Sequence, residues 1–280
     1  MSSVNELKLL RSFMPLLPAN DQVLTGPGDD CAVLKWNDES DLLVTVDQLM
    51  EDIHFLPGTS GAAAGAKLVR RNMSDIAAMG GTPLWGVLTF GASGKSEEWL
   101  LDFMKGASAE CAKYGTALCG GDIASLPAPG MVSTFTLAGK VPAGRAVLRS
   151  GAKPGETLYV TGEIGNSFHS EHHLNFTPRL DLAETMLKEA SAMLDISDGL
   201  LLDAERLAAA SNVDLLIDPG AVPLRKGAKL PDALSDGEDY ELLFCGRAGL
   251  PFHAVGKVLP GTGRVSVAGL KEIASYGYEH

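Results

Sequence analysis

The sequence predicts a two-domain protein of the α+β class, in which each α/β-type domain combines a β-sheet with helices. Short apolar segments of strand character alternate with longer segments whose apolar residues recur every three or four positions, as in helices. A stretch rich in glycine, proline and basic residues, Pro142 to Pro154, divides this alternation into two sets. We therefore place the domain boundary after Pro142, which gives domains at residues 1–142 and 143–280.

The first set begins with a short amphipathic helix, followed by two strands that a polar turn joins. The second helix is expected to end at Gly80-Gly81, because glycine commonly terminates helices. In chain order, the expected elements are a helix at 6–14, strands at 31–36 and 42–47, a helix at 62–79, a strand at 85–90, a helix at 97–114 and a strand at 132–141.

The second set has the same alternation after the glycine- and proline-rich stretch. Its expected elements are a strand at 157–161, helices at 180–190 and 200–210, and strands at 214–217, 240–245, 254–258 and 264–267. Neither a fixed-period repeat nor a low-complexity tract interrupts this alternation, so a solenoid or a disordered chain is not expected.

The composition is that of a globular protein with an acidic surface. Hydrophobic residues make up 45% of the chain and charged residues 21%, close to the average for globular domains. Asp and Glu number 35 against 23 Lys and Arg, which gives a formal net charge of −12. This balance argues against non-specific nucleic-acid binding, which needs basic residues to neutralise phosphates. A polyphosphate ligand remains compatible with it, because bound divalent cations reverse the local charge.

The four cysteines suggest a reducing cytoplasm, since none is spaced as in a zinc site or a redox motif. Cys119 and Cys245 lie in apolar runs and are expected to be buried thiols. The first residues lack a basic segment followed by an apolar run, so we expect no signal peptide. No segment is long and apolar enough for us to expect a membrane span.

The segment Gly91-Ala-Ser-Gly-Lys-Ser96 resembles a phosphate-binding P-loop but lacks one required glycine. A P-loop needs a glycine five positions before Gly94, and Thr89 stands there. We expect instead a surface loop in which Ser96 caps the next helix, with Glu97 favourable near its N-terminus.

Acidic residues recur where the expected strands and helices begin or end. Each has an ordinary structural alternative, namely a turn, an exit to solvent or a helix N-cap. For Ser197 and Asp198, the alternative is an N-cap of the helix at 200–210. The acidic positions at these element ends are Asp29 and Asp30 in a Gly-Pro-Gly turn, Asp47, Asp122 after Gly120-Gly121, Asp195, Asp198 and Glu238.

Three further polar residues lie beside apolar neighbours. Asn72 and Asp75 are three positions apart on an expected helix, so they share one face and need polar partners. The alternative for Asp75 is an ion pair with Arg71 at i, i+4. His54 is either a hydrogen-bonded packing residue or part of a site.

Taken together, so many acids near element ends favour a site in which they converge. Convergent oxygen ligands suit Mg²⁺, and two or more such ions would neutralise a nucleoside triphosphate. Arg145 and Arg149 could add planar donors for phosphate oxygens, or could belong to a solvated basic linker.

At these residues the chain resembles the thiamine-monophosphate kinase family, within the superfamily of aminoimidazole ribonucleotide synthetase and selenophosphate synthetase. The similar segments follow one another in the family's order over nearly the whole chain. They are GPGDDCAVL from Gly26, VDQLMEDIHF around Asp47, NMSDIAAMGGTP from Asn72, GGD from Gly120, GRAVLRSGAKPGE from Gly144, LDISDGL from Leu194 and SDGEDYEL from Ser235.

The resemblance implies a kinase that transfers the γ-phosphoryl group of ATP to thiamine monophosphate. It also implies an N-terminal mixed sheet with helices on one face that pairs in a homodimer, a C-terminal α/β sandwich, and an active site in the cleft between domains. By position, it assigns magnesium ligation to Asp30, Thr45, Asp47, Asp75, Asp122, Asp195 and Asp198. It assigns ATP binding to Arg149, Ser197 and Asp122, and substrate binding to His54, Glu238 and Tyr276. It assigns no catalytic acid or base.

The chain departs from the family pattern at two places. From Gly165 the chain runs almost directly into the element that ends at Arg179, so a helix of the second domain is expected to be missing or reduced. The position of an aromatic that stacks on thiamine in the family is Ser275 here, and Tyr276 is the nearest substitute.

Two other functions are compatible with the same motifs. The first is a related ATP-dependent enzyme that acts on another small acceptor, such as formylglycinamidine ribonucleotide or selenide. The second is a non-catalytic protein that binds thiamine phosphate or a nucleotide.

Overall fold

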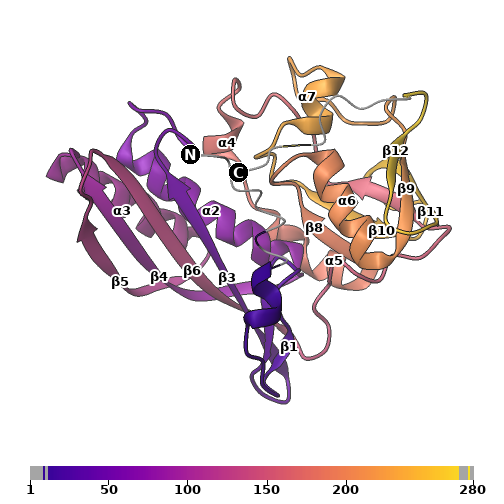
Figure 1. Cartoon of the computed structure of the whole chain (residues 1–280), viewed down its shortest axis with the longest axis horizontal. Coiled ribbons are helices and arrows are strands. Elements are labelled where there is room, and N and C mark those ends of the chain that lie inside the picture. Colours follow the sequence, from indigo (N-terminus) through magenta and orange to yellow (C-terminus); the bar gives the residue numbers. More distant parts are fainter. Residues whose placement is uncertain (1–8, 10–11, 271–276, 278–280) are drawn as a thin grey trace.

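The computed structural model describes residue 9, residues 12–270 and residue 277. It has two six-stranded mixed sheets, each with helices packed against it (Figure 1). The first sheet has the order β1-β2-β3-β6-β4-β5 and is antiparallel except between β4 and β5. Its strands are β1 (Val23–Thr25), β2 (Ala32–Lys35), β3 (Ser40–Met50), β4 (Thr82–Ser93), β5 (Ala117–Ser125) and β6 (Gly130–Pro142).

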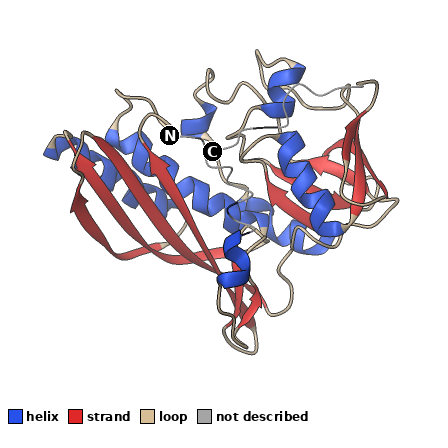
Figure 2. Cartoon of the chain, in the orientation of Figure 1, coloured by secondary structure: helices blue, strands red, loops and turns tan. Residues whose placement is uncertain are grey.

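Two long helices, α2 (Gly61–Ala78) and α3 (Glu97–Lys113), cover one face of this sheet (Figure 2). Ser60 and Ser96 cap them, accepting hydrogen bonds from the backbone N–H groups of Ala63 and Trp99. The Ser96 cap is confirmed, but the surface loop predicted for the segment resembling a P-loop is shorter than expected, because Gly91 to Ser93 end β4 and only Gly94 and Lys95 connect it to the cap. The core between helices and sheet is apolar, and Leu68, Met73, Ile76, Phe103 and Phe135 are fully buried in it.

The second sheet has the order β12-β9-β11-β7-β10-β8, and only β12 and β9 are parallel. One face packs against the helix α6 (Leu200–Ser211). The other face packs against α5 (Ala183–Glu189) and the end of α2. Ala78 of α2 belongs to one hydrophobic cluster with Tyr159 and Met193 of this sheet. The strands are β7 (Thr157–Val160), β8 (Ala190–Asp195), β9 (Val213–Ile217), β10 (Leu242–Gly246), β11 (His253–Pro260) and β12 (Val265–Val267).

Short helices complete the second half: α4 (His172–Asn175), α7 (Leu230–Ser235) and the 3-10 helix η2 (Leu180–Leu182). Between β7 and η2, α4 is the one helix, and it has four residues. The compressed sequence after Gly165 therefore forms a loop with a single short turn of helix, as its length predicts. The chain passes between the two sheets from Pro142 to Thr157.

The structure confirms the predicted class of mixed α and β layers, with differences in detail. The helix expected at residues 6–14 lies mostly outside the described residues, which show a 3-10 helix η1 (Met14–Leu16). The strands β1 and β5 and the short helices α4 and α7 were not expected as such, and the helix expected at 180–190 is divided into η2 and α5. Cys119 is exposed, so its predicted burial is wrong; it lies on β5, an edge strand of the first sheet, whereas Cys245 lies on β10, which has a neighbour on both sides, and is buried as predicted.

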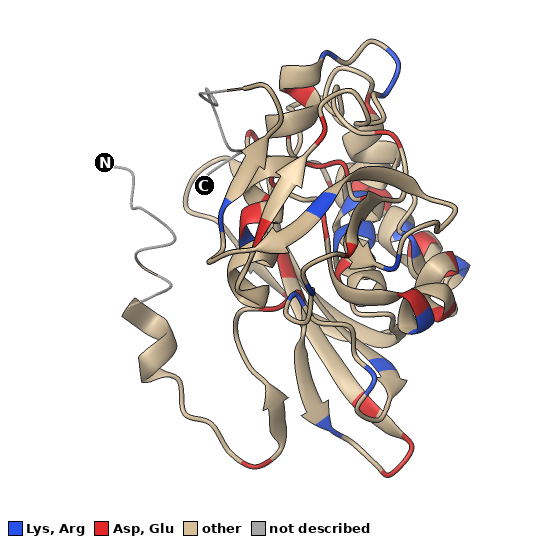
Figure 3. Ribbon diagram, turned by 90° about the vertical axis from the view of Figure 1, so that its right-hand side faces the viewer, with Lys and Arg blue, Asp and Glu red and all other residues tan. Residues whose placement is uncertain are grey.

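None of the helices among the described residues has the length and apolar character that a bilayer crossing requires. Lys and Arg alternate with Asp and Glu over the second half rather than forming a basic stripe (Figure 3).

Candidate active site

Three aspartates from three elements meet where the two halves of the chain touch. Asp30 precedes β2, Asp75 lies on α2, and Asp195 ends β8. One carboxylate oxygen of each lies within 4.8 Å of the others. This convergence is what the sequence predicts for these three residues, and it joins both halves of the chain.

Hydrogen bonds hold each of these carboxylates in place. The guanidinium of Arg149 donates to Asp30 Oδ1 through Nε (3.2 Å) and Nη2 (2.5 Å). Thr45 Oγ1 donates to Asp75 (2.5 Å), and Ser74 Oγ donates to Asp195 (2.5 Å). Neutral hydroxyl donors orient two of the carboxylates, but they add no positive charge.

The cluster holds more negative charge than its own donors compensate. Burial and the neighbouring carboxylates raise the pKa of Asp75 and of Asp195 well above the usual range. Burial also raises the pKa of Asp30, although Arg149 opposes this shift. Asp30 Oδ2 is buried without a hydrogen-bond partner among the described residues. A divalent cation fits this donor set, because it would supply both the missing charge and a partner for that oxygen.

Asp47 lies next to this cluster, near the C-terminal end of β3. Its carboxylate pairs with Arg71 (3.3 Å), and its backbone N–H donates to the buried side-chain oxygen of Asn72 (3.1 Å). The alternative of an Arg71–Asp75 ion pair is therefore wrong, because Arg71 reaches β3 instead of the next turn of its own helix. The charge of Asp47 contributes to raising the pKa of Asp75.

The loop from Asp195 to Gly199 is held by a carboxylate from the helix that follows it. Asp203 Oδ2 accepts hydrogen bonds from the backbone N–H groups of Ser197 (3.0 Å), Asp198 (3.0 Å) and Gly199 (3.2 Å). Gly199 is the N-cap residue and α6 has no side-chain N-cap bond, so the N-cap alternative for Ser197 and Asp198 is wrong. Arg206 joins Asp198 (2.6 Å) to Asp203 (2.7 Å).

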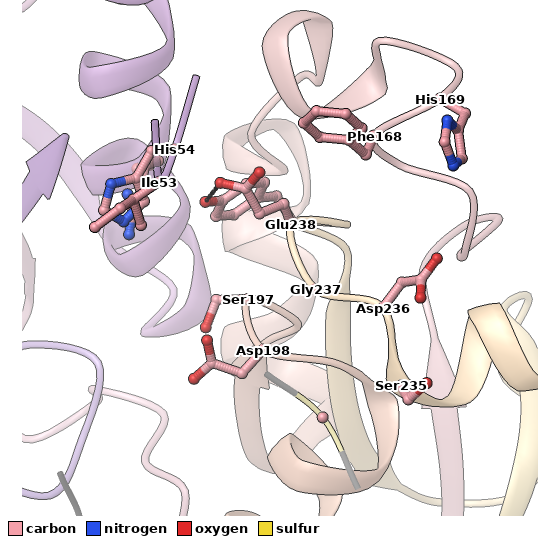
Figure 4. Close-up of a pocket in the computed structure, with 13 residues that line it drawn as sticks. Ile53, His54, Phe168, His169, Ser197, Asp198, Ser235, Asp236, Gly237 and Glu238 are labelled. Atoms are coloured by element: carbon pink, nitrogen blue, oxygen red, sulfur yellow. Dashed lines mark hydrogen bonds between the residues drawn. The ribbon is translucent and has the colours of Figure 1, made fainter. Parts of the chain in front are cut away.

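A pocket of about 510 Å³ opens beside this loop (Figure 4). Ile53 and His54 of the first half lie across it from the loops of the second half. The residues that line it are Ile53, His54, Arg71, Phe168, His169, Ser197, Asp198, Ser235, Asp236, Gly237, Glu238, Tyr240 and Gly277. The pocket thus combines aromatic, acidic and backbone groups from segments that are far apart in the sequence.

His54 and Glu238 face one another across this pocket through a buried lysine. Lys67 Nζ donates to the carbonyl oxygen of His54 (2.5 Å) and pairs with Glu238 Oε1 (2.6 Å). The His54 ring accepts a hydrogen bond at Nδ1 from the backbone N–H of Met50 (2.9 Å). His54 is therefore both a hydrogen-bonded packing residue, 6% exposed, and part of the pocket wall.

The backbone is strained where it presents Glu238. Glu238 and Tyr240 have φ angles of 63° and 52°, in the left-handed region that side chains other than glycine rarely adopt. The aromatic ring of Tyr240 stacks on Phe176 at 4.0 Å, and the Glu238 backbone N–H bonds to Ser197 O at 2.7 Å. Such strain is commonly found at binding and catalytic sites.

Two assigned residues lie outside this arrangement. Asp122 is exposed on β5, in register with Thr89 of β4, and lines a separate groove with Leu101 and Ile123. Tyr276 lies outside the described residues, as does Ser275, although the adjacent Gly277 lines the pocket. Arg145 donates to the carbonyl oxygen of Leu187 (2.9 Å), away from the aspartates, so of the two arginines only Arg149 contacts the aspartate cluster.

Sequence reasoning missed Lys67, Ser74 and Phe168. Lys67 has a visible signal, a single cation within the small and apolar run from Ala62 to Val69 of a helix. Ser74 lies between two site residues on α2 but shows no pattern of its own. Phe168 has no signal, because only the folded loop brings it to the pocket.

Comparisons with known proteins agree with these observations. A family model described as AIR synthase related protein, N-terminal domain, matches residues 28–141. The chain is 34% identical to the thiamine-monophosphate kinase of Salmonella typhimurium, over 89% of each protein. It is 31% identical to the enzyme of that name from Rhodopirellula baltica, over 98% of this chain and 96% of the other.

The solved structure of AaThiL complexed with AMPPCP and TMP is similar to this chain throughout its length. The TM-score is 0.88 at 30% sequence identity, and the match covers 100% of this chain and 98% of the other. Sequence identity above 30% over nearly the full length, together with this fold and the converging aspartates, places the chain in the thiamine-monophosphate kinase family.

Proposed function

We propose that this protein transfers the γ-phosphoryl group of ATP to thiamine monophosphate, giving thiamine diphosphate and ADP. The observation that carries the proposal is the convergence of Asp30, Asp75 and Asp195 beside a pocket shared by both halves of the chain. The similar structure that holds an ATP analogue and TMP supports both substrates, and the similarity to thiamine-monophosphate kinases supports the reaction.

Mg²⁺ is the cation that this donor set suits best, since it prefers carboxylate oxygens and substrate phosphates. We infer that Asp30, Asp75 and Asp195 hold it, and that Asp47, Thr45 and Asp198 complete sites for two or more ions. When bound, Mg²⁺ neutralises phosphate charge and orients the triphosphate.

The residues of this chain then have positioning roles rather than acid or base roles. Arg149 and Ser197 are proposed to contact ATP, while His54, Glu238 and Tyr276 are proposed to bind the acceptor. The acceptor is already a phosphate anion, so it needs little deprotonation before it attacks. Placing the two phosphates in line and neutralising their charge supplies most of the rate enhancement.

The direct test is a coupled assay with ATP, Mg²⁺ and a panel of phosphorylated acceptors. ADP and thiamine diphosphate are expected with thiamine monophosphate, and much less ADP with the other acceptors. Folded protein that forms no product would contradict the proposal. Turnover with a different acceptor would favour the related enzyme, and calorimetric binding without turnover would favour the non-catalytic binding protein.

We also propose a homodimer in the cytoplasm. The strand β5 is an edge of nine residues with Ile123 73% exposed, and Leu101 of α3 beside it is 54% exposed. Long exposed edges are normally covered by another element or another chain. A reducing compartment that contains ATP suits four free thiols.

A further inference from the structure

Phe168 is an aromatic side chain held at the pocket with 46% of its surface exposed. An exposed phenyl ring gives up much of the free energy that its burial would provide. Phe13 is exposed to a similar extent, 48%, but it does not line this pocket. What distinguishes Phe168 is therefore its place in a built cavity rather than its exposure.

Its neighbours fix Phe168 rather than leaving it on a loose loop. Ser167 is 1% exposed, and its hydroxyl donates to the carbonyl oxygen of Glu238 (2.5 Å). The Ser167 carbonyl oxygen accepts from the backbone N–H of His173 (3.1 Å). The backbone on one side of Phe168 is thus tied both to the strained Glu238 loop and to α4.

The ring of Phe168 is supported from behind by an imidazole. Phe168 stacks on His173 with 4.7 Å between ring centroids and 22° between ring planes, and His173 is 5% exposed. Burial, and then the nearby charge of Lys67, lower the pKa of His173, which keeps this imidazole neutral near pH 7. A ring held in this way binds a planar partner with little further loss of conformational freedom.

Three carboxylates also line the pocket that Phe168 enters. Asp198, Asp236 and Glu238 line it together with Phe168, and in Figure 4 the Phe168 ring lies above Glu238 on the side away from Asp198. The cation Arg71 also lines the pocket and is paired with Asp47, while Glu238 and Asp198 are paired with Lys67 and Arg206. An aromatic face beside carboxylates is the chemistry that recognises a positively charged, planar ring.

We propose that Phe168 is a specificity-determining residue whose ring stacks on the cationic heteroaromatic part of the acceptor, with Glu238 compensating the acceptor's charge. This inference rests on the proposed function, because it assigns a contact within the same acceptor site. It makes the shortened loop after Gly165 part of the site rather than a lost wall of it.

The test compares F168L, F168W and the matched control F13L in the full chain. F168L removes the ring but keeps an apolar side chain, whereas F168W restores a stacking surface. KM for thiamine monophosphate is expected to rise about 10-fold in F168L, given the usual strength of stacking on an aromatic side chain. KM for ATP and kcat should stay within about twofold, since only the acceptor's ring loses a contact. F168W should keep an acceptor KM close to that of the unchanged protein, and F13L should match it throughout.

A second measurement keeps the result independent of folding. Calorimetry with thiamine monophosphate should give the same fold-change in Kd for F168L, while thermal unfolding shows each variant folded. An unchanged acceptor KM and Kd in F168L would overturn the inference but leave the kinase intact. Equal losses in kcat and in both KM values would overturn it as well, since they indicate a disturbed fold. If the unchanged protein neither binds nor phosphorylates thiamine monophosphate, the proposed function fails, and this inference fails with it.

Discussion

Asp195 shows how one residue of the cluster combines burial with like charge. It is 4% exposed, accepts a hydrogen bond from Ser74, and has its pKa raised by burial and by Asp30. Asp195→Asn removes a buried negative charge and keeps the side-chain shape. We expect its free energy of unfolding without metal to rise by on the order of 1 kcal/mol, because like charges in the cluster repel. Turnover should fall by about 100-fold or more, since charge compensation of the phosphates is lost.

Thermal unfolding with and without Mg²⁺, alongside the kinase assay, tests this expectation. Mg²⁺ should stabilise the unchanged protein, because a ligand that binds only the folded state raises its stability, and it should stabilise D195N much less. The control is Asp38→Asn, in an exposed turn, which should alter neither quantity. Full turnover in D195N would show that the cluster does not hold the catalytic cation.

Lys67 is a fully buried cation that joins the two sides of the pocket. Its pKa is lowered to about 8, mainly by burial; Glu238 opposes this shift and Arg71 adds to it. As the pH rises through 8, Lys67 loses its proton and Glu238 loses its charged partner. KM for the acceptor should therefore decrease above about pH 8, because Glu238 is then free to compensate the acceptor's positive charge, and in Lys67→Met it should be low and independent of pH between about 7 and 9.

This lysine should also make the free energy of unfolding depend on pH. The unfolded chain keeps the lysine proton to about pH 10.5, whereas the folded chain releases it near 8. Stability from this group therefore rises between these pH values, and K67M should lack that rise. K67M should lower the free energy of unfolding at pH 7 by about 3 kcal/mol, because removing one partner of a buried ion pair leaves Glu238 without its counter-charge. Lys140→Met, at an exposed site on β6, is the control. An acceptor KM that does not vary with pH in the unchanged protein would contradict this role.

At the scale of elements, the helices α2 and α3 approach one another through glycines. A Cβ atom at Gly65 would lie 2.1 Å from the backbone oxygen of Phe103, and one at Gly106 would lie 2.1 Å from that of Ala62. Backbone atoms cannot move aside as a side chain can. Gly65→Ala should therefore force the helices apart and lower the free energy of unfolding by about 3 kcal/mol.

Urea denaturation of G65A and of Gly220→Ala tests this packing. Gly220 lies in an exposed turn where the nearest atom to an added Cβ is Asp218 Oδ1 at 3.4 Å, so G220A should be close to neutral. If G65A is as stable as G220A, the close approach of α2 and α3 at Gly65 is not required for stability.

The long elements could be predicted because their hydrophobic period is regular. The expected helix at 62–79 is observed as Gly61–Ala78, and the expected helix at 97–114 as Glu97–Lys113. The strand β5 was missed because Gly120-Gly121 has the composition of a turn. In the fold, Gly121 lets β5 pair with β4, since a Cβ there would lie 1.7 Å from the oxygen of Leu88. Pairing between distant segments decides that strand, and local sequence does not record it.

The aspartate cluster could be predicted from residue type and position in the sequence, but the contacts that complete the pocket could not. Asp30, Asp75 and Asp195 stand at element ends or among small residues, and these positions already favour convergence. The contact of Lys67 with Glu238 and the support of Phe168 by His173 depend on loops from both halves folding together. Such contacts between distant segments leave no periodic signal in either one.

At the scale of the whole molecule, the site exists only where the two halves meet. Asp30 and Asp75 come from the first half and Asp195 from the second, while Lys67 on α2 reaches Glu238 of the second half. Binding of a cation or nucleotide should therefore stabilise the two halves against each other. Neither half of the chain by itself would have the three aspartates or a complete pocket.

The exposed edge of the first sheet leads to a prediction about assembly. β5 has nine residues, whereas β1 at the opposite edge has three. A long edge with an exposed isoleucine is a template for pairing with another chain, and a lysine on it opposes that pairing. Ile123→Lys should therefore raise the dimer dissociation constant by about 10-fold or more, because burying an unpaired charge is costly. Sedimentation at several protein concentrations measures this constant directly.

Leu259→Lys serves as the control, because Leu259 is 38% exposed on β11 of the other sheet. It should leave the sedimentation of the protein unchanged. Asp122, adjacent to Ile123, lies apart from the aspartate cluster of its own chain. If Asp122 contributes to the active site of the second copy in a dimer, turnover should fall when the dimer dissociates. A monomeric unchanged protein with full turnover would rule out both the dimer and any role of Asp122 that depends on it.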